Sequence, residues 1–329
     1  MRRLLPAVLI FLAIGPVPGA EMWFPVADES QQARAIPIAF APQPSGTLRF
    51  VRGWHLVSPN SHFGGFSALA RMGTGRYQLV GDNGYWVRMD FGGGDRLHAV
   101  RIGRIPTPEG RPRRKTMVDT EAMTFDPATG ESRVALEGVN EVWRFDAALR
   151  RVESRNHLPD WPGNRGPEAM AHIAGGRTVI FSEDASDDPR GRQALLFADD
   201  PAAPGTKPLR FFYDAEGKGN VSDAAPLPDG RILLVHRKLG FDPFFTTILA
   251  IVDPADIAKD AVVRSVPIGR VPGPLADNFE GAAVALEDGR TRLWLVSDNN
   301  FNSWQRSLLL EFDLVDLPPR KAGSKKAAP

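Results

Sequence analysis

The chain has 329 residues and a formal net charge of +1; it is 43% hydrophobic and 24% charged, with 29 prolines, 32 glycines and no cysteine. This composition is typical of a globular, turn-rich β protein whose core is large enough to fold without disulfides. The lack of cysteine excludes disulfides, a lipoprotein anchor and thiolate zinc sites. No basic stripe interleaved with aromatic residues is present, so no nucleic-acid partner is expected.

Residues 1–20 have the pattern of a bacterial secretory signal peptide. Two arginines precede an apolar run over residues 4–14, and small residues follow, so we expect cleavage after Gly19 or Ala20. The run is too short to span a bilayer, and no transmembrane segment is expected once the leader is removed. The predicted location is the periplasm or the exterior of a bacterial cell. The alternative is a buried N-terminal helix.

After the leader we expect an N-terminal extension over 21–46, an orphan strand over 47–57 and then five similar units. The units begin at Gly64, Asp119, Gly166, Val221 and Asn278. When the units are aligned on their first short strand, the corresponding positions are Ser67, Glu121, Glu168, Asp223 and Glu280. These positions lie 54, 47, 55 and 57 residues apart, a period typical of an array of supersecondary units.

Each unit contains four short β runs; in the fourth unit they are SDAAPL, RILLVHR, TTILAIVD and VVRSVPIG. Four strands in a repeat of ~50 residues predict an all-β fold, a β-propeller of five four-stranded blades, with six blades as the alternative. The last unit has only three evident strands, so residues 47–57 are expected to complete its blade and close the ring. The propeller is expected to occupy 47–317, followed by a disordered basic tail over 318–329.

The repeated acids predict a cation site. The first strand of each propeller blade lines the central channel, so the equivalent positions should form a ring, and four carboxylates there would repel one another. A divalent cation between them would remove the conflict. Oxygen ligands suit Ca²⁺, or alternatively Mg²⁺, and the scarcity of nearby histidine argues against zinc. The other interpretation is that these acids cap turns or pair with arginines.

A second polar set follows the second strand of each unit and comprises Asp82, Glu137, Glu183, the basic run of His236, Arg237 and Lys238, and Asp298. Similar offsets from the first set predict that these side chains gather at one mouth of the channel. The basic run would attract a phosphate or carboxylate group there, and His236 could act as an acid or base. The alternatives are a structural His236 and ordinary turns at Asp82 and Asp298. Trp161 and Trp304 fall in loops and are candidates for a substrate rim.

The motifs GGFSAL…GDNG, DTEAM, GPEAM and NFEGAA…SDNNF resemble those of the secreted phytase-like family, described as "esterase-like activity of phytase". The resemblance covers residues 48–315 and implies a phosphoesterase activity. It carries functional roles onto Glu121, Glu168, Glu280, Asp82 and Asp298, whereas Asp223 is added from the repeat alone. The EG and DNN pieces are also similar to calcium-dependent lactonase and gluconolactonase propellers, in which an axial Ca²⁺ polarises an ester carbonyl.

We therefore expect a secreted, Ca²⁺-dependent hydrolase that acts on a small anionic ester or phosphate-containing substrate, as a monomer. The expected catalytic residues are Glu168, Glu280, His236 and Arg237. The expected metal ligands are Glu121, Glu168, Asp223, Glu280, Asp82 and Asp298. Two alternatives stay open: a lactonase or carboxylesterase with the same metal, and a non-catalytic binding propeller with a structural metal.

Overall fold

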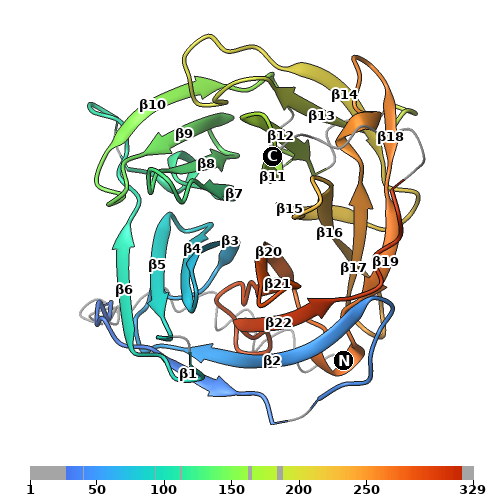
Figure 1. The fold of residues 1–329 in the computed structure, drawn as a ribbon. Coiled ribbons are helices and arrows are strands. Elements are labelled where there is room, and N and C mark those ends of the chain that lie inside the picture. The colour runs from blue at the N-terminus through green and yellow to red at the C-terminus, as the bar shows by residue number, and fades with distance from the viewer. Residues whose placement is uncertain are drawn as a thin grey trace, which may run out of the picture.

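The protein is a five-bladed β-propeller, seen down its channel in Figure 1. The computed structural model describes residues 27–320, except 40, 93, 112, 162–164 and 184–187. The predicted signal peptide and residues 321–329 of the predicted tail lie outside the described residues. The five-blade prediction is confirmed, and the six-blade alternative is wrong.

Each blade is built around four antiparallel strands. Blade 1 contains β3 (Phe66–Gly73), β4 (Arg76–Gly81), β5 (Tyr85–Asp90) and β6 (Ala99–Arg104). Blade 2 contains β7 (Thr120–Phe125), β8 (Ser132–Leu136), β9 (Glu141–Phe145) and β10 (Val152–His157). Blade 3 contains β11 (Pro167–Ile173), β12 (Arg177–Ser182), β13 (Arg192–Phe197) and β14 (Leu209–Asp214). Blade 4 contains β15 (Asn220–Pro226), β16 (Ile232–Leu239), β17 (Phe245–Val252) and β19 (Val266–Arg270).

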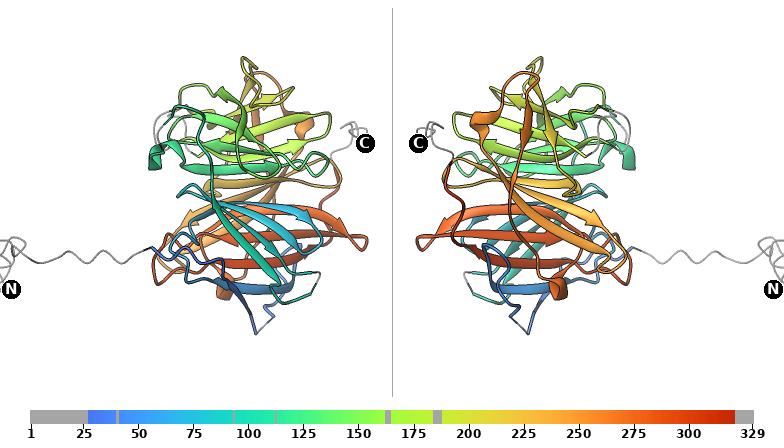
Figure 2. Two further views of the ribbon diagram at one scale, coloured as in Figure 1. Left: turned by 90° about the vertical axis from the view of Figure 1, so that its left-hand side faces the viewer. Right: turned by 90° about the vertical axis from the view of Figure 1, so that its right-hand side faces the viewer.

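Blade 5 joins the two ends of the propeller. It contains β20 (Phe279–Glu287), β21 (Arg290–Ser297) and β22 (Leu308–Leu314), and its fourth strand is β2 (Leu48–Val57), which pairs antiparallel with β22. The predicted closure by residues 47–57 is thus confirmed, and Figure 2 shows β2 in blue beside the red strands of blade 5. A further short strand, β1 (Arg34–Pro37), pairs with the outer edge of β2.

The fourth unit differs from expectation in its last run. Residues 262–269 were predicted to form one strand, but the structure divides them at Ser265. The first part, β18 (Val262–Arg264), pairs in parallel with β14 of blade 3, and only β19 completes blade 4. The hydroxyl groups of Ser265 and Tyr213 are hydrogen-bonded at 2.6 Å, which fixes the chain where it passes between the two blades.

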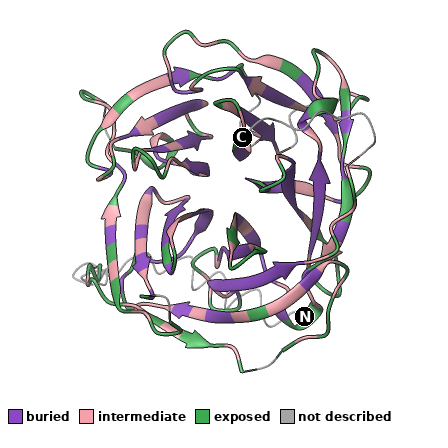
Figure 3. Ribbon diagram, in the orientation of Figure 1, coloured by how far each residue is buried: buried purple, intermediate pink, exposed green. Residues whose placement is uncertain are grey.

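The core lies between the blades, where the inner strands are covered on both faces. Residues 178–182 of β12 and 232–236 of β16 are all buried, as their nearly continuous apolar sequences predict. Figure 3 shows buried residues concentrated in the inner strands and exposed residues in the loops. Trp143 and Trp294 are fully buried among them. This packing holds the first strands rigidly around the channel.

The connecting segments are short or irregular. The described residues contain three single-turn 3-10 helices, η1 (Lys115–Met117), η2 (Pro254–Asp256) and η3 (Gly273–Leu275). None of the helices in the described part of the chain is long and apolar enough to cross a membrane. At the C-terminal end, Arg320 pairs with Asp253 at 2.7 Å, so the first residues of the predicted tail contact blade 4.

Candidate functional site: an acidic mouth of the central channel

Every first strand carries a β-bulge at the same place. The pairing of the first and second strands skips one residue in each blade, and the skipped residues are Ser67, Glu121, Glu168, Ser222 and Glu280. A bulge re-aims the side chain of the extra residue and ends regular pairing. Because β3, β7, β11, β15 and β20 surround the channel (Figure 1), the five bulges form a ring around it.

The bulge corrects the predicted alignment of the fourth unit. The residue equivalent to Glu121 is Ser222, and Asp223 is the next residue along the strand. The carboxylate of Asp223 accepts hydrogen bonds from the backbone N–H groups of Ala224 at 2.8 Å and Ala282 at 2.6 Å. Asp223 therefore joins blade 4 to blade 5. The structure does not bring it to the other ring carboxylates.

The two ring serines also connect neighbouring blades. The hydroxyl of Ser67 donates to the carbonyl oxygen of Thr120 at 2.6 Å, and that of Ser222 donates to the carbonyl oxygen of Phe279 at 2.9 Å. The first ring consequently contains three acids, not four.

A second ring follows the second strands. The backbone N–H groups of Asp82, Glu137, Glu183 and Asp298 each donate to the carbonyl oxygen of the residue two places before the bulge, at 2.8–3.1 Å. In blade 4 the same position is occupied by Arg237, which is paired with Asn220. The ring is thus four acids and one arginine. Its members come from all five blades and lie at the mouth next to the bulges.

Arg237 is the centre of a bonded network on one side of this mouth. Its guanidinium forms ion pairs with Glu280 and, at 3.3 Å, with Glu183, and it donates to Asn278 Oδ1 at 2.9 Å. The amide of Asn278 in turn donates to Glu280 at 2.9 Å and to Asp298 at 3.3 Å. Burial lowers the pKa of Arg237, but the surrounding carboxylates, Glu280 first, more than offset this effect and hold the pKa above its ordinary value. The guanidinium is therefore a permanent positive charge within the site.

The opposite side of the mouth has no comparable buried cation among the described residues. Carboxylate oxygens of Asp119, Glu121 and Glu137 all lie within 4.8 Å of one another. Asp82 Oδ1 is buried and has no hydrogen-bond partner within the described part of the chain. The nearest cation is Lys115 of η1, an exposed side chain whose Nζ lies 3.5 Å from Asp82 Oδ2. Closely spaced oxygens with an unpartnered carboxylate oxygen nearby fit a hard divalent cation.

Burial, together with the neighbouring charges, raises the pKa values of the acids at this mouth. Burial, reinforced by Glu168 and Glu280, raises the pKa of Glu121 well above its ordinary value. Burial, reinforced by Glu183 and Glu280, does the same for Glu168. Burial and the Glu280 charge raise the pKa of Asp298 to about 8. Because these carboxylates repel one another, they do not all ionise together. A bound cation would offset the repulsion and favour their ionised forms.

Only one of the three ring glutamates pairs with an arginine. Glu280 contacts Arg237, whereas Glu121 and Glu168 accept no hydrogen bond from the residues that the structure describes. The alternative interpretation, in which the repeated acids bond backbone N–H groups or pair with arginines, thus applies to Asp223 and Glu280 and not to Glu121 or Glu168.

His236 lies elsewhere. Successive residues of a strand point to opposite faces of the sheet, so His236 and Arg237 cannot both face the mouth. The imidazole is fully buried, its Nε2 lies 2.7 Å from the hydroxyl of Tyr213, and burial lowers its pKa to about 3. It is packed between blades 3 and 4, which agrees with the alternative in which His236 has a structural role.

Replacing Tyr213 by phenylalanine tests this placement. The change removes the hydroxyl that contacts both His236 and Ser265. We expect the free energy of unfolding to fall by about 1–3 kcal/mol, because buried polar groups lose a partner. Urea denaturation measures this loss. Any activity measured with the unmodified protein should be unchanged in this variant, and an altered activity at unchanged stability would contradict the structural role of His236.

Sequence reasoning missed three contributors to the mouth. Asp119 and Asn278 both stand two residues before a bulge, and Lys115 lies in the loop before blade 2. Asp119 and Asn278 stood within the repeated motifs, and their constant offset from the glutamates was the signal that could have found them. The pairing of Lys115 with Asp82 depends on the course of a loop, which no repeated pattern in the sequence indicates.

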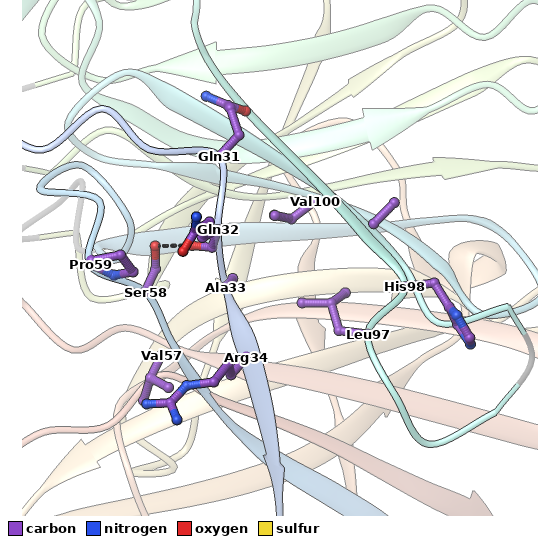
Figure 4. A pocket seen from close by; sticks show the side chains of 11 residues that line it. Gln31, Gln32, Ala33, Arg34, Val57, Ser58, Pro59, Leu97, His98 and Val100 are labelled. Atoms are coloured by element: carbon purple, nitrogen blue, oxygen red, sulfur yellow. Dashed lines mark hydrogen bonds between the residues drawn. The ribbon is translucent and has the colours of Figure 1, made fainter.

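The hollows on the described surface include two that differ in character from the acidic mouth. A cleft of about 910 Å³ occupies the outer edge between the N-terminal segment and β6, where Arg34, Ser58 and His98 line it (Figure 4). Among the described residues, no acidic side chain lines this cleft. A second cavity of about 250 Å³ lies at the other end of the first strands, among Met123, Met170 and several alanines. The channel is therefore charged at one end and largely apolar at the other.

The fold and the site together define a class of protein, a five-bladed propeller whose blades supply carboxylates to one mouth of the channel. A family model described as "Phytase-like: Esterase-like activity of phytase" matches residues 61–301. The chain belongs to this phytase-like family, as its motifs predicted. No curated protein matches the chain significantly.

Solved structures that are similar to this chain at low sequence identity include the following three. The glutaminyl cyclase of Myxococcus xanthus is 12% identical with a TM-score of 0.48, over 83% of this chain and 100% of that one. The allergen Mala s 1 of Malassezia sympodialis is 12% identical with a TM-score of 0.47, over 85% and 96%. A putative gluconolactonase is 11% identical with a TM-score of 0.45, over 87% and 94%. Likeness at this level says nothing about activity.

Proposed function

We propose that this protein is a secreted, Ca²⁺-dependent hydrolase of phosphate esters that acts at the acidic mouth of its channel. The observation that carries the proposal is the division of this mouth. Three carboxylates with oxygens within 4.8 Å of one another occupy one side, and a half-buried arginine occupies the other. Family membership supports an esterase-type activity. The proposed location, the periplasm or the cell exterior, follows from the leader sequence alone.

The residues present suit Ca²⁺, with Mg²⁺ as the alternative. Asp119, Glu121 and Glu137 would hold the ion, and the unpartnered Oδ1 of Asp82 is available beside them. When bound, such an ion supplies a positive charge that neutralises the acids and polarises an ester oxygen. Arg237 provides a second, fixed positive charge on the other side, so an anionic ester between the two sides meets positive charge from both.

Two glutamates are placed for proton transfer. Burial raises the pKa of Glu280, but Arg237 and Asn278 both bond its carboxylate and oppose that rise, so Glu280 is the ring glutamate placed to accept a proton from the attacking water. Glu168 lies among Glu137, Glu183 and Glu280 and accepts no hydrogen bond from the described residues. Such an environment favours the protonated form, which would donate its proton to the leaving alkoxide.

A substrate screen tests the proposal. Purified protein with Ca²⁺ is assayed against phosphomonoesters, phosphodiesters, lactones and carboxylic esters. Turnover of a phosphate ester that disappears with EDTA and returns with Ca²⁺ is the expected result. Turnover confined to lactones or carboxylic esters would replace the phosphoesterase proposal by the esterase alternative. No turnover of any ester, with Ca²⁺ bound, would leave a binding propeller with a structural metal.

A further inference from the structure

Exposed aromatic side chains stand beside the acidic mouth. Phe244 and Phe245 close the hairpin between β16 and β17, and Trp304 lies in the loop between β21 and β22. The rings of Phe245 and Trp304 are nearly parallel, with their centroids 6.2 Å apart. The ring of Phe244 is nearly perpendicular to that of Trp304, with a centroid distance of 5.6 Å. These three residues form what we call the aromatic platform. Trp304 is 63% exposed and Phe244 is 50% exposed.

Both segments that carry the platform, the β16–β17 hairpin and the β21–β22 loop, follow directly after residues of the second ring. The strand β16 passes through Arg237 before it reaches the hairpin, and the Trp304 loop begins at Asp298. The same loop reaches blade 1. A side chain added at Gly65 would place its Cβ 2.5 Å from the ring of Phe301 and 2.4 Å from Asp82 Oδ1, so Phe301 lies next to a carboxylate of the mouth. Arg237 and Asp298 of the mouth and Phe301 next to Asp82 therefore connect the aromatic platform to the acidic site.

The loop that carries Trp304 is held in one shape by its own side chains. Asp298 Oδ1 accepts from the N–H of Asn300 at 2.6 Å, and Asn302 Oδ1 accepts from the N–H of Gln305 at 2.9 Å. Asn299 Oδ1 accepts from the N–H of Gly65 at 3.0 Å, which ties the loop to blade 1. A rigid loop presents an aromatic ring to a ligand without a large loss of conformational entropy on binding.

We propose that the aromatic platform is a specificity subsite that binds an apolar, aromatic group of the ester substrate while its anionic group lies at the channel mouth. The inference rests on the proposed function, because the mouth supplies the other half of the contact. An exposed cluster of large aromatic rings on a soluble protein marks a binding surface. The fixed loop, shared with Asp298, favours a small ligand that spans both sites. Stacking on such rings adds to affinity without requiring a hydrogen bond.

The test compares the binding of three probes by calorimetry in the presence of Ca²⁺: 2-naphthyl phosphate, methyl phosphate and 2-naphthol. Every protein in this test carries Glu168→Gln and Glu280→Gln so that neither phosphate is hydrolysed, and the protein with no further change is called unmodified. We expect the protein to bind 2-naphthyl phosphate more tightly than methyl phosphate. The Trp304→Ala variant should weaken the binding of both naphthyl probes by roughly three- to tenfold and leave that of methyl phosphate unchanged. The matched control is Phe241→Ala, which removes a fully exposed ring (102%) from the same hairpin and should change none of the three.

The outcomes separate this inference from the proposed function. Failure of both phosphates to bind, with Trp304-dependent binding of 2-naphthol, would refute a phosphate site but support the platform. Equal binding of both phosphates by the unmodified protein, or equal weakening of both by Trp304→Ala, would overturn the platform. It would also be overturned if Trp304→Ala and Phe241→Ala left the naphthyl probes unaffected but both abolished sedimentation with phosphatidylcholine vesicles, a result that indicates a membrane contact. Circular dichroism of each variant verifies its fold.

Discussion

Replacing Glu168 and Glu280 together by glutamine should abolish phosphate ester hydrolysis while the protein stays folded. Glutamine keeps the shape of both side chains but can neither accept a proton from water nor deliver one to a leaving group. Loss of one acid–base residue commonly costs 10²–10⁴-fold in rate. We therefore expect kcat to fall by at least about 10³-fold in the double variant, as measured with the best substrate of the screen.

The stability of this variant supplies the internal check. Burial is the largest cause of the raised pKa of both glutamates, so neutralising Glu168 should not lower the melting temperature. Neutralising Glu280 also removes its ion pair with Arg237 and should lower the melting temperature without unfolding the protein. The control is Glu153→Gln on blade 2, a residue that pairs with Arg151 on the surface and should leave turnover unchanged. Retention of turnover by the Glu168 and Glu280 double variant would refute their catalytic assignment.

Ca²⁺ should raise the melting temperature of the metal-free protein by about 5–10 °C. An ion at 100 times its dissociation constant stabilises the folded state by about 2.7 kcal/mol, and a chain of this size gains roughly 2–4 °C for each kcal/mol. EDTA should reverse the gain. Replacing Glu121 and Glu137 by glutamine should remove it, because those side chains belong to the group of closely spaced carboxylates. A thermal shift that survives both replacements would place the ion elsewhere.

The raised pKa of Asp298 predicts how the stability of the metal-free protein depends on pH. The pKa of Asp298 is raised by burial and by Glu280 to about 8, so the folded state keeps a proton that the unfolded chain releases near pH 4. The folded state thus holds an extra proton on Asp298 between these two values, which makes stability fall as the pH rises from about 4 to 8. Buried His236, whose pKa is lowered to about 3, acts in the opposite sense up to about pH 6.5, so the net fall in stability is expected between about pH 6.5 and 8. For each proton that the folded state retains, the free energy of unfolding falls by about 1.4 kcal/mol per pH unit. Urea denaturation across this range, with and without Ca²⁺, measures the slope. A stability that rises between about pH 6.5 and 8 in the metal-free protein would contradict the raised pKa of Asp298.

The fold could be predicted from the sequence because its signal is repeated. Five copies of one pattern fixed the blade count, and the incomplete last unit predicted the pairing of residues 47–57 with the final strand. The recurring Glu121, Glu168 and Glu280 gave the first ring for the same reason. One copy of a motif would have supported none of these conclusions.

The errors arose where a single residue decides the geometry. Alignment of the units on their first strand predicts Asp223 as the ring position of blade 4, but the bulge falls on Ser222. No feature of the sequence marks where strand pairing skips a residue. His236 and Arg237 were placed together because they are adjacent and basic. Their alternation along β16 sends one into the core and the other to the mouth, which the two-residue period of a strand could have indicated.

The pairing of β2 with β22 affects how the protein can be made. The two strands lie at opposite ends of the propeller sequence, yet each completes the hydrogen bonding of the other. During synthesis the early strand must wait, with one edge unsatisfied, until nearly the whole chain has been made. A nascent chain that stops short of Leu308 would leave that edge open to pairing with other chains.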